Sequence, residues 1–236
     1  MGRPLDVSYD FRVDSKGRDP DLASPTLREY HRMLWSRTTP TGQSIQLSMR
    51  SDFYLVAEIQ GQMLALSSDT ITNSLSSHKT CSFLVENADP SLVEDVKAKG
   101  STIGARIVFP GKSRTGHQTI NVLRGFHPLI RDRFDLTLEC IRLYYLGQPS
   151  PLSGALQVNR RFFDLFKDFN GYVEFFLLQD LVNGAVVTYF DNFDGDFSRG
   201  PYPRSVEEYE IYLRNNLKFV SARNHRIARV AGAGNN

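Results

Sequence analysis

Apolar and polar residues alternate with two different periods along this chain, and the change of period separates a strand-forming first half from a helix-forming second half. Several segments of the first half show the period of two that marks a strand with one buried face, or are short apolar runs bounded by turn residues. We expect strands at residues 7–13, 53–59, 62–66 and 101–109, and a short later one at 186–190. Gln60-Gly61 separates the second from the third and predicts a hairpin.

Helices are predicted where apolar residues recur every three or four positions behind a capping residue. Ser24 and Asp89 each precede a proline that suits a first helical turn, and Ser205 with Glu208 forms a capping box. The expected helices span residues 25–36, 90–99, 128–146, 153–169, 172–182 and 205–230, with a further short one capped by Ser68-Asp69.

The order of these elements indicates an α+β fold, with a mixed or antiparallel sheet mainly from the N-terminal half packed by helices mainly from the C-terminal half. Strands and helices do not alternate regularly, as they would in a doubly wound parallel sheet. No segment has the composition of a linker, so we expect one domain over residues 1–236 with a disordered tail at 231–236.

Composition narrows the class of protein without deciding its activity. Hydrophobic residues make up 41% of the chain and charged residues 23%, which is typical of a protein with a core and not of a disordered chain. The apolar stretches are shorter than the ~18 residues of a membrane span, and the N-terminus lacks a signal-peptide core. We therefore expect a cytoplasmic protein without a membrane partner. Two cysteines, Cys81 and Cys140, predict neither a disulfide framework nor a zinc site, and we expect no metal or cofactor.

Residues 128–146 combine an apolar helix with a dense set of charges. On a helical wheel, apolar side chains cover most of the circumference, so we expect this helix to be mostly buried. The remaining wedge holds the charged residues Arg131, Asp132, Asp135, Glu139 and Arg142. Arg133 is the exception and falls in an apolar sector. Charges beside a core require partners. The wedge is therefore either a structural ion-pair network or one wall of a wet pocket.

The residues directly before this helix favour a pocket for an anion. Arg124 and His127 stand at its expected N-terminus, where free backbone N–H groups and the helix dipole attract negative charge. Upstream, the loop at residues 111–118 adds basic side chains without forming a P-loop, because Arg106 occupies the position of the first Walker glycine. The predicted ligand-binding residues are Lys112, Arg114, His117, Arg133 and Arg142.

Two further groups of residues could bind ligands but have simpler interpretations. Asp191, Asp194 and Asp196 follow a strand without the spacing of a calcium loop, and we expect an exposed acidic turn. Tyr30 and Trp35 flank His31 on one helix, and we expect core aromatics with an exposed histidine.

Five stretches of the chain together resemble a widespread bacterial family of unknown function. They are residues 102–104 (TIG), 107–111 (IVFPG), 119–121 (TIN), 124–128 (RGFHP) and 132–142 (DRFDLTLECIR). Runs within residues 19–36 and 171–180 are similar too, so the resemblance spans nearly the whole chain. It implies a single domain and assigns no catalytic residue, because no activity is known for the family.

The residues support a first functional hypothesis, a bacterial protein that binds RNA, DNA or a nucleotide. Its catalytic form is a phosphodiester-cleaving toxin or phage-defence nuclease, with His127 as general acid or base and Arg124 and Arg131 stabilising charge on the phosphate. Acidic residues of the same helix complete the predicted site and would bind a divalent ion in a metal-dependent version; they are Asp132, Asp135 and Glu139.

The second hypothesis is a non-catalytic interaction module. In this case the charged wedge is structural, and the phenylalanine-rich segments of the second half bind another protein or a second copy of the chain. Residues alone do not decide whether the protein is an enzyme.

Overall fold

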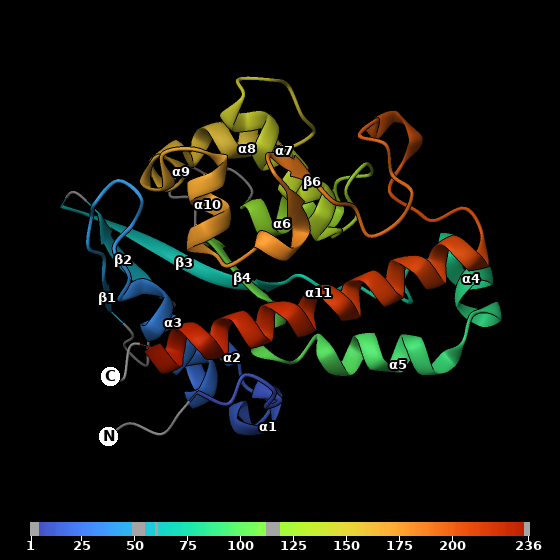
Figure 1. The fold of residues 1–236 in the computed structure, drawn as a ribbon, viewed down its shortest axis with the longest axis horizontal. Coiled ribbons are helices and arrows are strands. Elements are labelled where there is room, and N and C mark those ends of the chain that lie inside the picture. Colours follow the sequence, from blue (N-terminus) through green and yellow to red (C-terminus); the bar gives the residue numbers. More distant parts are fainter. Residues whose placement is uncertain (1–4, 49–54, 60, 112–118, 234–236) are drawn as a thin grey trace.

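A four-stranded antiparallel sheet and one long helix form the frame of the protein (Figure 1). The computed structural model describes residues 5–48, 55–59, 61–111 and 119–233. The strands follow the order of the sequence: β1 (Gln46–Ser48), β2 (Val56–Ile59), β3 (Gln62–Thr70) and β4 (Arg106–Pro110). The predicted hairpin is confirmed, with Ile59 paired to Gln62 and Gly61 in a left-handed conformation. The C-terminal half of β3 then pairs with β4.

Helices outnumber strands in the second half, which confirms the predicted α+β class. The first half contributes α1 (Phe11–Ser15), α2 (Pro20–Ala23), α3 (Pro25–Trp35), α4 (Ser82–Asn87) and α5 (Pro90–Lys99). The second half contributes α6 (Ile120–Phe126), α7 (Phe134–Tyr145), α8 (Ser153–Val158), α9 (Arg160–Phe163), α10 (Phe169–Phe175) and α11 (Val206–Ala233). The second half also contains a two-stranded ribbon, β5 (Val182–Asn183) with β6 (Val186–Val187).

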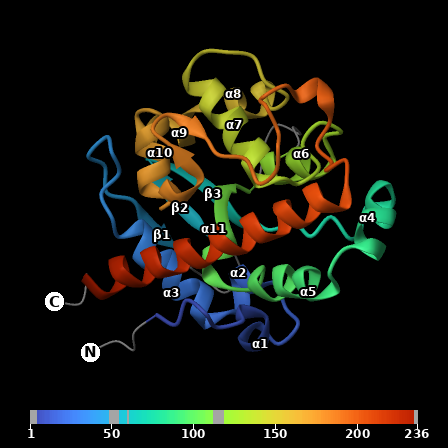
Figure 2. The ribbon, with the colours of Figure 1, turned by 45° about the vertical axis from the view of Figure 1, so that its right-hand side comes forward.

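Three helices begin where the capping residues predict. The side chains of Ser24, Asp89 and Ser205 accept hydrogen bonds from backbone N–H groups of the first helical turns of α3, α5 and α11. Helix α11 crosses the length of the molecule, with α5, α1 and α2 on one side and α6–α10 on the other (Figures 1 and 2). It continues to Ala233, so residues 231–233 are helical and not part of the expected tail, and residues 234–236 lie outside the described residues.

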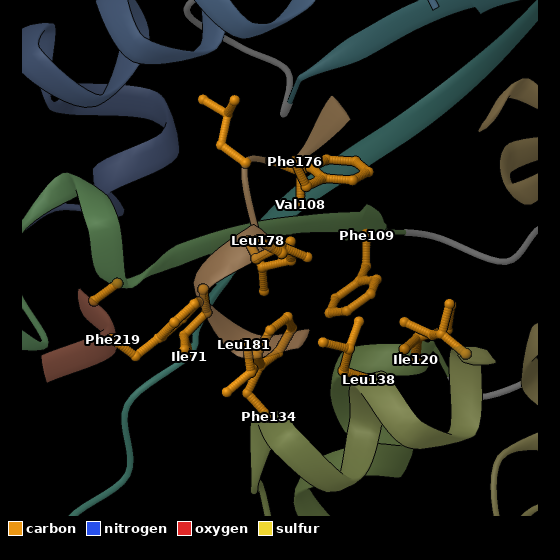
Figure 3. Close-up of a cluster of buried hydrophobic side chains, with 14 of the residues drawn as sticks. Ile71, Val108, Phe109, Ile120, Phe134, Leu138, Phe176, Leu178, Leu181 and Phe219 are labelled. Atoms are coloured by element: carbon orange, nitrogen blue, oxygen red, sulfur yellow. The ribbon is translucent and has the colours of Figure 1, made fainter. Parts of the chain in front are cut away.

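The core lies where the sheet, α7 and α11 meet (Figure 3). Phe109 of β4, Phe134 and Leu138 of α7, and Phe219 of α11 are all at most 3% exposed. The phenylalanines of the second half also belong to the core, as their simplest interpretation predicts; the fully or nearly enclosed ones are Phe162, Phe163, Phe166, Phe169, Phe175 and Phe176.

The expected strand at residues 7–13 is wrong. Asp10 accepts a hydrogen bond from the Arg12 N–H and caps α1 instead. Phe11 is 4% exposed and Val13 is 62% exposed, so these two residues do not share a buried face. Ser68-Asp69 likewise caps no helix, because β3 runs through both residues to Thr70.

The most consequential correction concerns residues 128–146. Helix α7 begins only at Phe134, because residues 128–132 form turns. Arg131 and Asp132 have φ angles of 46° and 63°, in the left-handed region that no right-handed helix can include. These two residues therefore leave the predicted helix and its charged wedge.

Other boundaries of helices and strands differ from the predicted ones. The segment at 153–169 is divided into α8, α9 and the 3₁₀ turn Asp164–Phe166. Helix α10 begins at Phe169, before the predicted start at residue 172, and ends at Phe175; the turn Gln179–Leu181 follows it. Strand β4 begins at Arg106, after the 3₁₀ turn Ile103–Ala105. No helix in the described part of the chain is long and apolar enough to cross a bilayer.

Candidate functional site

The charged residues that the sequence assigns to one wedge lie in three separate clusters. We call them the Arg124 cluster (Arg124, Asp69, Asp132), the Arg133 cluster (Arg133, Asp135, Asp191) and the Arg142 pair (Arg142, Glu139). Each is built around one guanidinium group.

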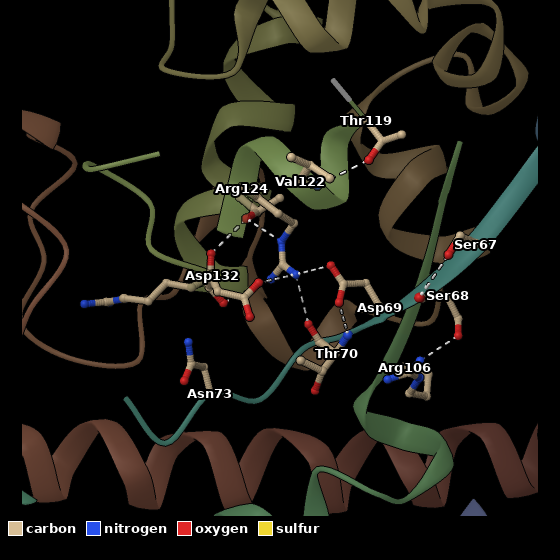
Figure 4. A network of polar contacts seen from close by, with 12 residues as sticks. Ser67, Ser68, Asp69, Thr70, Asn73, Arg106, Thr119, Val122, Arg124 and Asp132 are labelled. Atoms are coloured by element: carbon tan, nitrogen blue, oxygen red, sulfur yellow. Dashed lines mark hydrogen bonds and ion pairs between the residues drawn. The ribbon is translucent and has the colours of Figure 1, made fainter. Parts of the chain in front are cut away.

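In the Arg124 cluster, an enclosed guanidinium from α6 bridges two carboxylates (Figure 4). The Nη1 atom of Arg124 lies 2.7 Å from Asp69 Oδ2 and 2.7 Å from Asp132 Oδ1. Nε donates to Thr137 Oγ1 at 3.2 Å, Nη1 also donates to the Thr70 carbonyl at 3.2 Å, and Nη2 donates to the Asp132 carbonyl at 3.1 Å. Arg124 is fully buried. It therefore cannot contact a phosphate as its predicted role requires.

The two carboxylates of this cluster are close together and partly open to solvent. Because both contact the same nitrogen at 2.7 Å, their contacting oxygens are at most twice that distance apart. The side chains of Asp69 and Asp132 are 24% and 28% exposed. Burial raises the pKa of Asp132; Arg124 opposes this effect and the negative charge of Asp69 adds to it.

In the Arg133 cluster, all five N–H groups of one arginine are occupied. Nε and Nη2 donate to Asp135, Nη1 and Nη2 donate to Asp191, and Nη1 also donates to the Pro201 carbonyl at 2.8 Å. The guanidinium packs over the ring of Tyr212, 5.1 Å from its centroid. With 1% of its side chain exposed, Arg133 has no N–H left for the predicted ligand.

Asp191 corrects a second expectation, since it is not part of an exposed acidic turn. Its side chain is 3% exposed and anchors the segment before α11 to the start of α7. Burial raises its pKa, and the hydrogen bond and charge of Arg133 oppose that change. The Arg133 cluster is thus a structural junction between α7, this segment and α11.

The Arg142 pair lies further along α7. Arg142 donates to both oxygens of Glu139, at 2.8 Å and 2.7 Å, and the Glu139 side chain is 4% exposed. Asp132, Asp135 and Glu139 therefore belong to three different clusters. In the part of the chain that the structure describes, no group of three or more His, Cys, Asp or Glu side chains could hold a metal ion. This arrangement contradicts a metal-dependent site on those three carboxylates.

Arg131 differs from Arg124, Arg133 and Arg142 because no carboxylate among the described residues pairs with it. Its positive charge acts on His127, His78 and Tyr202, whereas the charges that act on Asp132 are those of Arg124 and Asp69. We call Arg131, His127, His78 and Tyr202 the Arg131 face. All four are half-buried, and the Nε atom of Arg131 is enclosed without a hydrogen-bond acceptor.

The two histidines of the Arg131 face are held by specific contacts. His78 Nδ1 lies 3.2 Å from the Tyr202 hydroxyl, with the ring centroids 5.6 Å apart. His127 Nδ1 accepts a hydrogen bond from the Leu129 N–H at 3.2 Å. Partial burial lowers the pKa of both histidines, and the charge of Arg131 lowers it further. Both rings are therefore mainly neutral at pH 7.

The Arg124 cluster fixes the turn that carries this face. The Arg131 N–H donates to the His127 carbonyl, the Asp132 N–H to the Arg124 carbonyl, and Asn73 Nδ2 to the Arg131 carbonyl. These bonds maintain two consecutive left-handed residues, a conformation that costs free energy without such support. The buried ion pairs of Arg124 therefore help to hold the backbone of Arg131, whose own charge has no carboxylate partner among the described residues.

His127 does not lie at a helix N-terminus as predicted. It is the C-cap of α6, where the helix dipole is negative, and α7 begins seven residues later. The positive charge that acts on His127 therefore comes from Arg131 and not from a helix N-terminus. Lys112, Arg114 and His117 lie outside the described residues.

Sequence reasoning missed Asp69, His78 and Tyr202. They come from the end of β3, the segment after it and the segment before α11, far from residues 124–142 in sequence. No motif joins them, and only pairing of β3 with β4 and the path of α11 bring them together.

A fourth polar cluster joins α2 and α3 to the strands β3 and β4. His31 is fully buried, which corrects the expected exposed histidine, and its Nε2 lies 3.4 Å from Asp21 Oδ1. Asp21 also accepts from the Ser68 N–H at 2.8 Å and from the Ser68 hydroxyl, which in turn accepts from Arg106 Nη2. Burial lowers the pKa of His31 despite the nearby carboxylate. For Asp21, the partners His31 and Ser68 outweigh burial and lower the pKa to about 2.

The comparisons with known proteins bear on the family and not on the activity. The model of a family of unknown function, DUF6994, matches residues 5–227. The chain belongs to this family. The predicted resemblance is thereby confirmed, and the match with DUF6994 includes every described residue of the three clusters and the Arg131 face. No curated protein and no solved structure matches the chain.

Proposed function

We propose that this protein binds a phosphate-bearing ligand, namely RNA, DNA or a nucleotide, at the Arg131 face. The observation that supports this most is the guanidinium of Arg131, which is partly exposed and has no carboxylate partner among the described residues. Arg124, Arg133 and Arg142 are each neutralised by carboxylates. A planar guanidinium with free N–H groups matches the oxygens of a phosphate group.

The neighbouring histidines give this face a chemistry that suits RNA. A neutral imidazole can accept the proton of a 2′-hydroxyl group, and a guanidinium can stabilise the charge that develops on the attacked phosphate. His127 and His78 both lie within electrostatic reach of Arg131. We therefore propose metal-independent cleavage of RNA as the reaction. A neutral histidine takes the proton of the 2′-hydroxyl, the 2′-oxygen bonds to phosphorus, and the 5′-oxygen leaves with a proton from the other histidine in its protonated form. Because the pKa of both histidines is lowered, the protonated fraction is small at pH 7 and grows as the pH falls.

Arg131→Gln tests the binding proposal. We expect its affinity for a labelled single-stranded RNA of 12 nucleotides to fall about 10- to 100-fold, because a charge-assisted hydrogen bond contributes ~1.5–3 kcal/mol. Fluorescence anisotropy at several salt concentrations measures the loss, and the slope of log K against log salt should decrease by about one. DNA of the same sequence and a mononucleotide separate the three ligand classes.

A matched control is Arg32→Gln, which removes an exposed arginine that pairs with Glu29 on α3. It should bind like the wild-type protein. Equal affinities of the Arg131 variant and wild type, with both proteins folded, would contradict the binding site. Incubation of RNA with EDTA then tests cleavage, which His127→Ala and His78→Ala should each abolish while binding persists.

A non-catalytic interaction module is the second candidate, and one observation favours it. Val122 and Phe126 lie one turn apart on α6 with 38% and 76% of their surface exposed. An apolar surface of this kind suits a protein partner. In that case Phe126→Ser would weaken self-association or partner binding, and Arg131→Gln would leave both unchanged.

A further inference from the structure

A cavity of about 200 Å³ lies against α11, on residues other than those of the Arg131 face. Helix α11 contributes Asn215, Lys218, Phe219 and Ala222, whose spacing of three and four places them on one side of the helix. The opposite wall comes from the turn Gln179–Leu181 and from residues 188–190.

The bottom of this cavity is aromatic. Leu181, Phe190 and Phe219 line it and are at most 3% exposed, and Leu181 and Phe219 belong to the buried cluster of Figure 3. The ring centroids of Phe190 and Phe219 are 6.0 Å apart. A cavity of about 150 Å³ can hold benzene. The space therefore fits one six-membered ring with a short substituent.

The rim of the cavity offers positive charge and hydrogen-bond donors. Both oxygens of Asp180 are occupied by Arg226, at 3.0 Å and 2.9 Å, so this acidic residue is neutralised. Lys218 is exposed and pairs with no carboxylate among the described residues. Asn215 donates one amide hydrogen to the Phe190 carbonyl at 3.0 Å, and its amide carries a second. An anionic group at the mouth would satisfy these donors.

We infer that this cavity binds a small monocyclic aromatic carboxylate, with the ring on Phe190 and Phe219 and the carboxylate on Lys218. An apolar pocket with a few convergent polar groups is the usual form of a small-molecule site. The inference does not depend on the proposed function, because the two sites share no residue.

Phenylacetate is the probe, and isotope-edited NMR of the full chain is the measurement. We expect saturable shifts at the amides of Thr188, Asn215 and Lys218, with a dissociation constant of about 1 mM or lower, as suits a ligand of this size. Phenylacetamide lacks the charge and acetate lacks the ring, so each should bind at least about 10-fold more weakly. Lys218→Met should weaken phenylacetate to the level of phenylacetamide.

Two variants keep the test decisive. Ala222→Phe fills the cavity and should abolish binding while circular dichroism shows an unchanged fold. Lys97→Met removes an exposed lysine that pairs with Glu94 on α5, outside the cavity, and should bind phenylacetate like wild type. The inference is overturned if no saturable shift occurs, if the shifts map elsewhere, or if the Lys218 variant retains full affinity.

Discussion

At the residue scale, the buried arginines of this protein bind two different kinds of hydrogen-bond acceptor, carboxylates and neutral groups. Arg133 is neutralised by two carboxylates, whereas Arg223 donates only to neutral acceptors, among them the carbonyls of Phe176, Gly104 and Arg106. Five fixed N–H groups allow a guanidinium to bind several chain segments at once. A basic residue of this sequence is therefore not a surface residue by default. Arg131 differs from Arg133 and Arg223 because it has no carboxylate partner among the described residues and its Nε has no acceptor.

The buried His31 predicts how stability depends on pH. Burial lowers its pKa in the folded protein, whereas the unfolded chain takes up the proton near pH 6.5. The unfolded state then binds more protons, so stability is fully present above pH 6.5 and decreases as the pH falls below it, by up to ~1.4 kcal/mol per pH unit. His31→Gln should show a smaller decrease than wild type between pH 7.5 and pH 5.5 in urea unfolding.

His127 and His78 contribute a loss of the same sign in both proteins, so the difference between wild type and variant reports His31 alone. Asp21 acts in another window, because its lowered pKa of about 2 stabilises the fold above pH 3.8 and this contribution is lost only below that value. Parallel pH profiles of variant and wild type would contradict a neutral, buried His31.

At the scale of elements, the turn between α6 and α7 decides where the charges point. An uninterrupted helix over 128–146 would place Arg131, Asp135 and Glu139 on one side. Two left-handed residues end that periodicity, so the charge of Arg131 acts on His127 and His78 while Asp135 is buried in the core. The break is stabilised by the Arg124 cluster, which comes from other elements.

The contact of α11 with the turn Ile103–Ala105 predicts unequal effects for two glycines. A Cβ on Gly104 would lie 2.6 Å from Asn224 Oδ1 and 2.7 Å from the Val220 carbonyl, and the Gly104 N–H donates to that same Asn224 oxygen. Gly104→Ala should therefore lower the free energy of unfolding by ~1–3 kcal/mol, the usual cost of overpacking. Urea unfolding measures it.

Gly125 is the matched control, since no atom lies within 4 Å of its added Cβ in α6. Gly125→Ala should stabilise the protein by ~0.5–1 kcal/mol, because alanine loses less backbone entropy in a helix. A neutral Gly104→Ala would show that α11 can move away from the sheet at little cost.

At the scale of the whole molecule, the two halves of the chain share one core. Trp35, the single tryptophan, lies on α3 of the first half and packs on phenylalanines of the second, with ring centroids 5.3 Å from Phe175 and 6.1 Å from Phe176. Arg223 of α11 donates to the Tyr30 hydroxyl of the same helix α3. Neither half can bury these residues without the other.

Because the two halves share one core, we expect a single cooperative unfolding transition. Trp35 fluorescence reports the packing of α3 on the second half, and circular dichroism at 222 nm reports all helices, so the two curves in urea should coincide. This experiment also tests the single domain expected from the sequence, which stays a prediction. Two separated midpoints would instead indicate independently folding halves.

The sequence by itself determined the features that depend on neighbouring residues. Capping residues before prolines located α3 and α5, the capping box located α11, and Gly61 located the hairpin, because the chemistry of a cap or turn lies within a few positions. The order of the predicted elements also indicated the α+β class correctly. Residues 7–13 are a counterexample, because they alternate like a strand. Asp10 instead caps a helix there, and Phe11 is buried whereas Val13 is exposed.

The tertiary structure alone decided which charges are available. Arg124, Arg131, Arg133 and Arg142 occur close together in the sequence. Their spacing places Arg133 in an apolar sector but does not show which of the four has carboxylate partners. Asp69 of β3 neutralises Arg124, and Asp191 of the segment before α11 neutralises Arg133. The charge of Arg131 instead acts on His78. The free energy of a buried charge depends on partners that are near in space, and a linear pattern does not record them.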